Sequence, residues 1–393
     1  MLHGRFFAEE GYVHFARMER VRSVKSLWYI NLHVGYYNLF CDVATWLAAR
    51  APLARAPLVT GWISLLLIVA LISTAMFLPS ELLPTPFTHI AAAALLIVGT
   101  VAVPEVWLNT INAQTYLGLL AVLLLFVEVD EIARPVFVGV VVALAVAVFT
   151  GLYAMVLAPL FVFQYVKRRT TRRAIVTAVV AGTTLVQVVL VAVSHTTGHL
   201  AEGRSLRFPG FGVLTRDVGA GHVSMFLFGG GLAERLHAHA YSFPGLLAFA
   251  TLALVVLGGL ALVLLVVPNR RVAGMLVAAF VLVEALVSFG DIHNAAGGRY
   301  AVVPIGLLTL ALVHATTARP SGVGTAAAVV CGLVLVSGLI NFWSYHPRVL
   351  RCVKKCPNWT AEVTRFQHGG SNTLTIWPYP HPNWHVTIPK SRR

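Results

Sequence analysis

The stretch PVFVGVVVALAVAVFTGLYAMVLAPLFVFQYVKRRTTRR, residues 135–173, decides the fold. Its apolar part, 135–166, is too long for one ordinary crossing of about 20 residues and short for two. The sequence FTGLYA, Phe149 to Ala154, can turn the chain, because glycine adopts backbone angles that other residues avoid. The run from Lys167 to Arg173 is the densest basic cluster in a short loop, and such loops lie on the cytoplasmic side of a membrane.

Similar apolar bands recur from Pro57 to Ile340. Of the 393 residues 58% are hydrophobic and only 11% are charged, whereas soluble domains carry roughly 25% charged residues. The sequence therefore predicts an all-α polytopic membrane protein with roughly ten transmembrane helices of near-membrane length. The expected spans are 57–78, 87–103, 114–127, 135–149, 151–167, 173–193, 245–267, 272–289, 300–315 and 322–341.

The C-terminal half orients consistently. With the Lys167–Arg173 loop in the cytoplasm, the loop 194–244 and the tail 342–393 are extracytoplasmic, and PNRR (268–271) and Arg319 are again cytoplasmic. The N-terminal half stays open. Two crossings in 135–166 put EVDEIARP (128–135) inside and PEVWLNTINAQ (104–114) outside with the N-terminal segment, whereas one crossing inverts all three. The basic residues of the N-terminal segment favour the inverted arrangement, so the residues alone do not decide.

Three regions follow from this pattern: an N-terminal segment 1–56, a transmembrane domain 57–341 that includes the loop 194–244, and the tail 342–393. Within the first, YYNLFCDVATWLAA (36–49) is short and interrupted by Asp42, which favours an interfacial helix. The net charge of +14 lies mostly in loops and ends and accompanies no recognition motif, so membrane lipid is the expected partner and nucleic acid is not. Cys352 and Cys356 favour a small disulfide in an extracytoplasmic tail.

Polar residues that carry chemistry cluster in three places. Glu9 and Glu10 form a carboxylate pair in RFFAEEGYVHF (5–15), which is either a general base held at a membrane surface or a solvated pair matched by nearby arginines. PEVWLNTINAQ holds Glu105, Asn109, Asn112 and Gln114, which bind ligand or cap the following helix. In GDIHNAAGGRY (290–300), Arg299 either binds a phosphate group or extends to the lipid headgroups. Glu284, inside a predicted span, needs a partner, and His293 or Arg299 are the candidates.

Several short motifs occur in a fixed order: FFAEEG, GYYNL, RAPLV, PEVWLNTINAQTYLGLL, GRYAVVP, IWP and NWHVTIP. In this set the chain resembles bacterial polytopic membrane proteins related to the GT-C superfamily, glycosyltransferases that use polyprenyl-phosphate sugars. The resemblance covers nearly the whole chain. Those proteins usually show Glu-Asp-Gly where this chain has Glu9-Glu10-Gly11, and a membrane span precedes that motif in them.

The resemblance implies a GT-C-like fold in the bacterial inner (plasma) membrane and a transfer of sugar from a polyprenyl-phosphate donor to a lipid or glycan acceptor. It implies that the acidic motif is catalytic base or metal ligand, with Glu10 as the base aided by Glu9, so a divalent metal ion stays open as a cofactor. Arg299 and Tyr300 would contact the donor, and Asn109, Asn112 and Gln114 the sugar. The alternatives are a transporter or flippase of a lipid-linked saccharide, and a scaffold for other envelope enzymes.

Overall fold

The computed structural model describes residues 5–28, 30, 35–99, 106–198, 210–237, 239, 242–290, 298–319, 321–344, 358–377 and 384–392. These residues are helical almost throughout. Six helices are long and apolar enough to cross a membrane. They are α3 (Ala56–Phe77), α9 (Thr171–Thr196), α12 (Phe243–Leu265), α13 (Arg270–Gly290), α14 (Val302–Ala315), which the 3-10 turn η6 (Gly298–Ala301) precedes, and α15 (Ser321–Ser344). The all-helical class is therefore confirmed, with six helices that could span a membrane by their length and composition.

Ten spans go beyond this result and stay a prediction. The helices α4 (Pro86–Val98) and α5 (Ala113–Leu125) have 13 residues each, fewer than the roughly 17–25 that a helical span needs. The helix α5 is nevertheless buried along almost its whole length, whereas α4 buries one face and exposes Phe87 and Ile90.

The apolar stretch that left the topology open is broken after Thr150. The helix α6 (Arg134–Thr150) is followed by α7 (Leu152–Met155) and α8 (Ala158–Lys167), and the chain bends by 115° at the break. Gly151 is in an extended conformation that any residue adopts, so its backbone freedom is not the reason for glycine here. The reason is space, because a Cβ on Gly151 would lie 2.7 Å from the Cβ of Gln114.

Two side-chain contacts show the relative direction of α6 and α9. Arg172 of α9 stacks on Phe137 near the start of α6, and Gln187 donates to the carbonyl of Val148 near its end. The helices α6 and α9 therefore run parallel. The chain runs along α6 to the break at Gly151, and α8 then returns it to the start of α9. The loops 126–133 and 168–170 therefore lie at the same end of the bundle. Both ends of the stretch thus lie at one end of the bundle, as two crossings or a re-entrant loop would place them.

An ion-pair network joins the loops at that end, which we call the basic end. Arg168 lies 2.9 Å from Glu81 and 2.6 Å from Glu128. The buried Arg173 lies 2.9 Å from Glu128, and Arg271, at the start of α13, also pairs with Glu81. The network connects the α3–α4, α5–α6 and α8–α9 loops to α13, and it brings together the segments EVDEIARP, KRRTTRR and PNRR.

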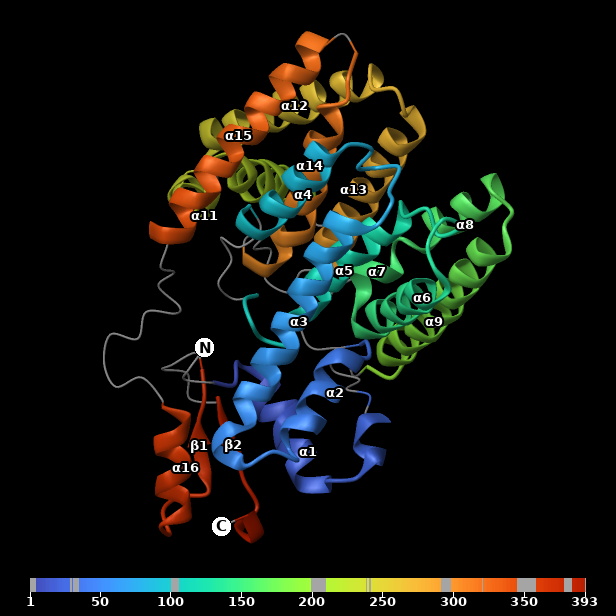
Figure 1. Cartoon of the computed structure of the whole chain (residues 1–393). Helices are drawn as coiled ribbons and strands as arrows, with labels where there is room; N and C mark the ends of the chain where they lie inside the picture. Colours follow the sequence, from blue (N-terminus) through green and yellow to red (C-terminus); the bar gives the residue numbers. More distant parts are fainter. Residues whose placement is uncertain are drawn as a thin grey trace.

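The two ends of the chain pack together at the opposite end of the bundle (Figure 1). The N-terminal part comprises η1 (Glu10–Phe15), α1 (Ala16–Val21), η2 (Val24–Trp28), α2 (Leu39–Ala48) and η3 (Leu53–Arg55). The C-terminal part comprises α16 (Trp359–Gln367), η8 (Lys390–Arg392) and an antiparallel pair of strands, β1 (Thr373–Thr375) and β2 (His385–Thr387). We call this unit the terminal subdomain.

Aromatic packing and an ion pair between the two ends of the chain help to hold the terminal subdomain together. The ring centroids of Phe6 and Phe15 are 4.2 Å apart, and Trp359 packs edge-on against Phe6 at 5.0 Å. Arg392 makes a two-pronged contact with the buried Glu19, both distances being 2.9 Å. The segments predicted as separate regions thus share one hydrophobic core. Cys352 and Cys356, predicted to form a disulfide, lie outside the described residues.

The region predicted as an outer loop, 194–244, contains helices in its described part. They are α10 (Phe211–Thr215), the π-helix η4 (Arg216–Val223) and α11 (Ser224–His237), which pack on α12 and α15. His222 of η4 is buried, and its Nδ1 lies 2.8 Å from Glu284. Glu284 therefore has His222 as a hydrogen-bond partner, which sequence reasoning missed, while the candidate His293 lies outside the described residues.

Candidate functional site

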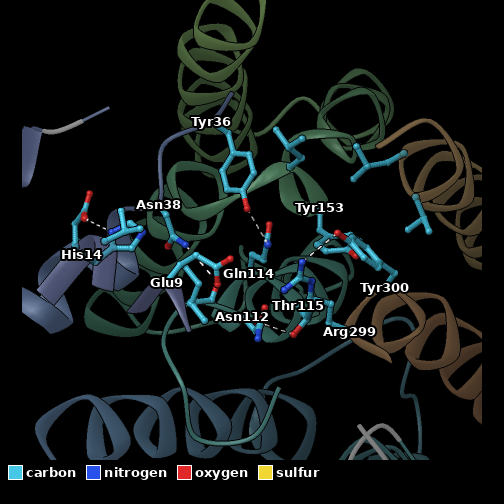
Figure 2. A pocket seen from close by; sticks show the side chains of 16 residues that line it. Glu9, His14, Tyr36, Asn38, Asn112, Gln114, Thr115, Tyr153, Arg299 and Tyr300 are labelled. Carbon is cyan, nitrogen blue, oxygen red and sulfur yellow. Dashed lines mark hydrogen bonds and ion pairs between the residues drawn. The ribbon is translucent and has the colours of Figure 1, made fainter. Parts of the chain in front are cut away.

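A pocket of about 130 Å³ lies where the terminal subdomain meets the ends of α5, α7 and α13. Five residues predicted from the sequence line it, although they come from three distant segments: Glu9, Asn112, Gln114, Arg299 and Tyr300. The other lining residues are Val13, His14, Tyr36, Asn38, Asp42, Ile111, Thr115, Leu152, Tyr153, Leu286 and Val287. Figure 2 shows polar side chains from all these segments around one space. The pocket is therefore polar on the subdomain side and partly apolar towards the helices.

The π-helix η1 determines which residues face the pocket. Glu9 immediately precedes η1, and His14 lies within it. In a π-helix the hydrogen bonds join residues five apart, so residues at this spacing lie one above the other. Glu9 and His14 thus share a face, whereas ordinary α-helical geometry would turn them apart. π-helical turns occur frequently at functional sites.

His14 is held by Asp42 of the helix α2. The Nδ1 of His14 lies 2.6 Å from Oδ1 of Asp42, and both side chains are buried. Asn38 fixes the start of α2, because its side chain accepts a hydrogen bond from the N–H of Cys41 at 3.2 Å. Burial raises the pKa of the Asp42 carboxyl, and the contact with His14 opposes that rise.

The start of α5 and the residue before it supply two amide groups of the pocket. Gln114 donates a hydrogen bond to the hydroxyl of Tyr36 at 3.1 Å. Asn109 does not line the pocket; its side chain is buried and accepts a hydrogen bond from the N–H of Asn112 at 3.0 Å. Asn109 therefore shapes the turn, and Asn112 and Gln114 reach the pocket. Glu105 lies outside the described residues.

Arg299 and Tyr300 enter the pocket from η6. The guanidinium carbon of Arg299 lies 5.1 Å from the centre of the Tyr300 ring, and Nη2 donates to the Tyr300 hydroxyl at 3.3 Å (Figure 2). Stacking on an aromatic ring orients a guanidinium. The arrangement presents a cation in the same pocket as the carboxylate of Glu9.

Glu10 is placed differently from Glu9. Its side chain is completely buried, it is not among the lining residues, and its carboxylate accepts hydrogen bonds from Thr110 and from the N–H of Phe7. Burial raises the pKa of Glu10, and these hydrogen bonds counteract the rise. Glu10 thus connects the N-terminal segment to the chain before α5, and Glu9 is the carboxylate of the motif that faces the pocket.

The residues present do not form a metal site of the usual kind. Within the part of the chain that the structure describes, no three His, Cys, Asp or Glu side chains are grouped so as to hold a metal ion. Of the two pocket carboxylates, Asp42 already contacts His14.

Comparison of the chain with protein-family models, with curated proteins and with solved structures finds no match. A function is therefore inferred from the residues and the geometry of the pocket. Sequence reasoning missed His14, Tyr36, Asn38, Thr115 and Tyr153 as pocket residues. The one available signal was Asp42, a carboxylate in an apolar run, which favoured an interfacial helix and also pointed to a buried polar contact.

Proposed function

We propose that this protein is a GT-C-like membrane glycosyltransferase, which moves a sugar from a polyprenyl-phosphate donor to a lipid or glycan acceptor on the extracytoplasmic face. One observation carries the proposal: Glu9 and Arg299, which are 290 positions apart in the sequence, line the same pocket between the terminal subdomain and the helix ends. Sugar transfer from a lipid phosphate needs a base for the acceptor and a cation for the leaving phosphate. The pocket contains both.

In the proposed reaction, the acceptor hydroxyl attacks the anomeric carbon of the sugar. The new carbon–oxygen bond forms as the bond from that carbon to the phosphate oxygen breaks, and the electron pair stays on the phosphate. Glu9 takes the acceptor proton, and Arg299 pairs with the phosphate. The amides of Asn112 and Gln114 are the groups that would bind the sugar hydroxyls, and the apolar side chains of Leu286 and Val287 face the lipid chain.

The arrangement of the loops supports the extracytoplasmic face. The pocket lies next to the terminal subdomain, and the basic end lies at the other end of the helices. Basic loops favour the cytoplasm. In the proposal, the basic end is cytoplasmic, and ten helical segments cross from it to the other face. The short helices α4 and α5 are two of these segments.

The test reconstitutes the protein in liposomes with a radiolabelled polyprenyl-phosphate sugar and a bacterial lipid extract as acceptor. Transfer is expected, so the label moves to a new chemical species. Arg299→Lys keeps the charge but loses the two-pronged fork, and we expect donor affinity to fall by roughly ten- to a hundredfold in Arg299→Ala and by less in Arg299→Lys. The exposed Arg235 is the control, because Arg235→Ala should bind donor normally.

Two outcomes would replace the proposal. Label that stays on the donor but reaches the other leaflet would indicate a flippase, the alternative that the intramembrane residue Glu284 also permits. Label that neither changes species nor moves would leave a scaffolding role.

A further inference from the structure

The imidazole of His14 stands between a buried carboxylate and the pocket. Its Nδ1 contacts Oδ1 of Asp42 at 2.6 Å, and both residues line the pocket. His14 is 7% exposed and Asp42 is 1% exposed. The second oxygen of Asp42, Oδ2, is buried and has no hydrogen-bond partner among the described residues.

The charges around His14 favour its protonated form. Asp42 and Cys41 contact it from α2, Glu10 lies close on η1, Arg17 acts on Asp42, and Glu9 and Arg299 share the pocket. The strand β2 also packs on η1, but its His385 is exposed. Burial lowers the pKa of His14, whereas the charge of the Asp42 carboxylate and the hydrogen bonds with Asp42 and Cys41 outweigh this effect and raise the pKa above 6.5. At neutral pH His14 is then a cation and a hydrogen-bond donor, and a poor base.

The proposed sugar transfer creates a need for such a group. A polyprenyl-phosphate sugar is a phosphodiester with one negative charge. When the bond to the sugar breaks, the phosphate becomes a monoester, whose second pKa is about 6 and which carries close to two negative charges above that pH. Arg299 neutralises one of these charges, and a second cation in the same pocket stabilises the other.

Resting on the proposed function, we propose that His14 is that second cation, and that His14 and Arg299 together form a binding site for an isoprenyl phosphate monoester. Asp42 is the positioning residue: it orients the imidazole and keeps it charged, and the opposite ring nitrogen donates to a phosphate oxygen. The two cations reach the site from η1 and η6, so the phosphate bridges the terminal subdomain and the helix bundle.

The test measures the binding of farnesyl phosphate and of farnesol to the protein in nanodiscs of neutral phospholipid. The range from about pH 7.5 to 10 is used, because the phosphate stays a dianion there and does not itself titrate. Wild type should prefer farnesyl phosphate to farnesol by at least about tenfold, and this preference should fall as the pH rises through the pKa of His14. Inorganic phosphate should bind at least about tenfold more weakly than farnesyl phosphate, since it lacks the apolar chain.

The variants separate the roles of the residues. His14→Gln should lose about tenfold in affinity at pH 7.5 and show no pH dependence. Asp42→Asn should move the midpoint of the alkaline fall to lower pH, because the carboxylate no longer stabilises the imidazolium. Arg299→Gln should bind more weakly at every pH but keep the pH slope. The exposed histidine of the same subdomain provides the control, and His385→Gln should match wild type.

Wild-type affinity and pH slope in His14→Gln would overturn the inference, and so would a wild type with no preference for the phosphate. Equal affinity for inorganic phosphate would overturn the isoprenyl assignment. A sugar-transfer assay on the same preparations separates the two proposals. Transfer with binding that is independent of His14 contradicts the inference alone, whereas His14-dependent binding without transfer contradicts the proposed function alone.

Discussion

The carboxylate of Glu10 accepts two hydrogen bonds from Thr110, one from the backbone N–H at 2.7 Å and one from the hydroxyl at 2.5 Å. A third hydrogen bond comes from the N–H of Phe7 at 3.2 Å. These contacts connect the first turn of the chain to the segment that precedes α5. The adjacent Glu9 faces the pocket. The two neighbouring carboxylates thus separate into one that fixes the pocket wall and one that is available for chemistry.

Glu10→Gln should therefore destabilise the fold. All three groups that contact the carboxylate are donors, so the amide NH₂ of glutamine would face at least one donor. A mismatch of this kind costs about 1–3 kcal/mol. The measurement is denaturant or thermal unfolding in detergent, with Glu9→Gln as the matched control, since Glu9 is partly exposed. Equal stability of the two variants would show that the Glu10 contacts contribute little.

The basic-end network should contribute more to stability than its position near a surface suggests. Glu128 pairs with Arg168 and with Arg173, whose side chain is only 5% exposed. Replacing Glu128 removes its charge-assisted hydrogen bonds, each worth about 1.5–3 kcal/mol, while Glu81 and Asp130 still lie near the two arginines. Glu128→Gln should accordingly lower the unfolding midpoint strongly. Glu131→Gln in the same loop is the control, because Glu131 is exposed and should change stability by no more than about 0.5 kcal/mol.

Impermeant thiol labelling of intact cells tests the arrangement of the loops. In a variant with all four native cysteines replaced by alanine, cysteines are placed at three exposed positions: Glu131, Arg169 and Gln367. The first two should be labelled only after lysis, and the third without lysis, because the terminal subdomain lies at the opposite end of the bundle. Labelling of Glu131→Cys and Arg169→Cys from opposite sides would contradict the return of the chain at Gly151.

The sequence predicted the helical class and five residues of the pocket, because apolar periodicity and polar residues at the ends of apolar runs are local patterns. It could not predict that Glu9 rather than Glu10 faces the pocket, since that depends on the π-helical turn and on Thr110, far along the chain. His14 was missed for the same reason. Gly151 was recognised as a turning point, but the close approach of Gln114 that requires glycine is visible only in three dimensions.

The pair of His14 and Asp42 should make stability depend on pH. The folded-state pKa of His14 is raised above 6.5, so its stabilising contribution is complete below the unfolded value and is lost as the pH rises through the folded value. Wild type should lose stability through that alkaline window, and His14→Gln should lose less. The measurement is the unfolding midpoint in detergent as a function of pH. Parallel curves for the two proteins would show that the pair contributes no linkage.

The most direct test of the account compares the turnover of a polyprenyl-phosphate sugar by wild type, Glu9→Gln and Glu10→Gln in nanodiscs, with donor binding measured on the same samples. A general base contributes about a hundred- to ten-thousandfold to rate, so kcat should fall by that factor in Glu9→Gln while donor affinity stays within a few fold. Folded Glu10→Gln should retain most of its turnover. Turnover that survives in Glu9→Gln but disappears in folded, donor-binding Glu10→Gln would contradict the assignment of Glu9 as the base.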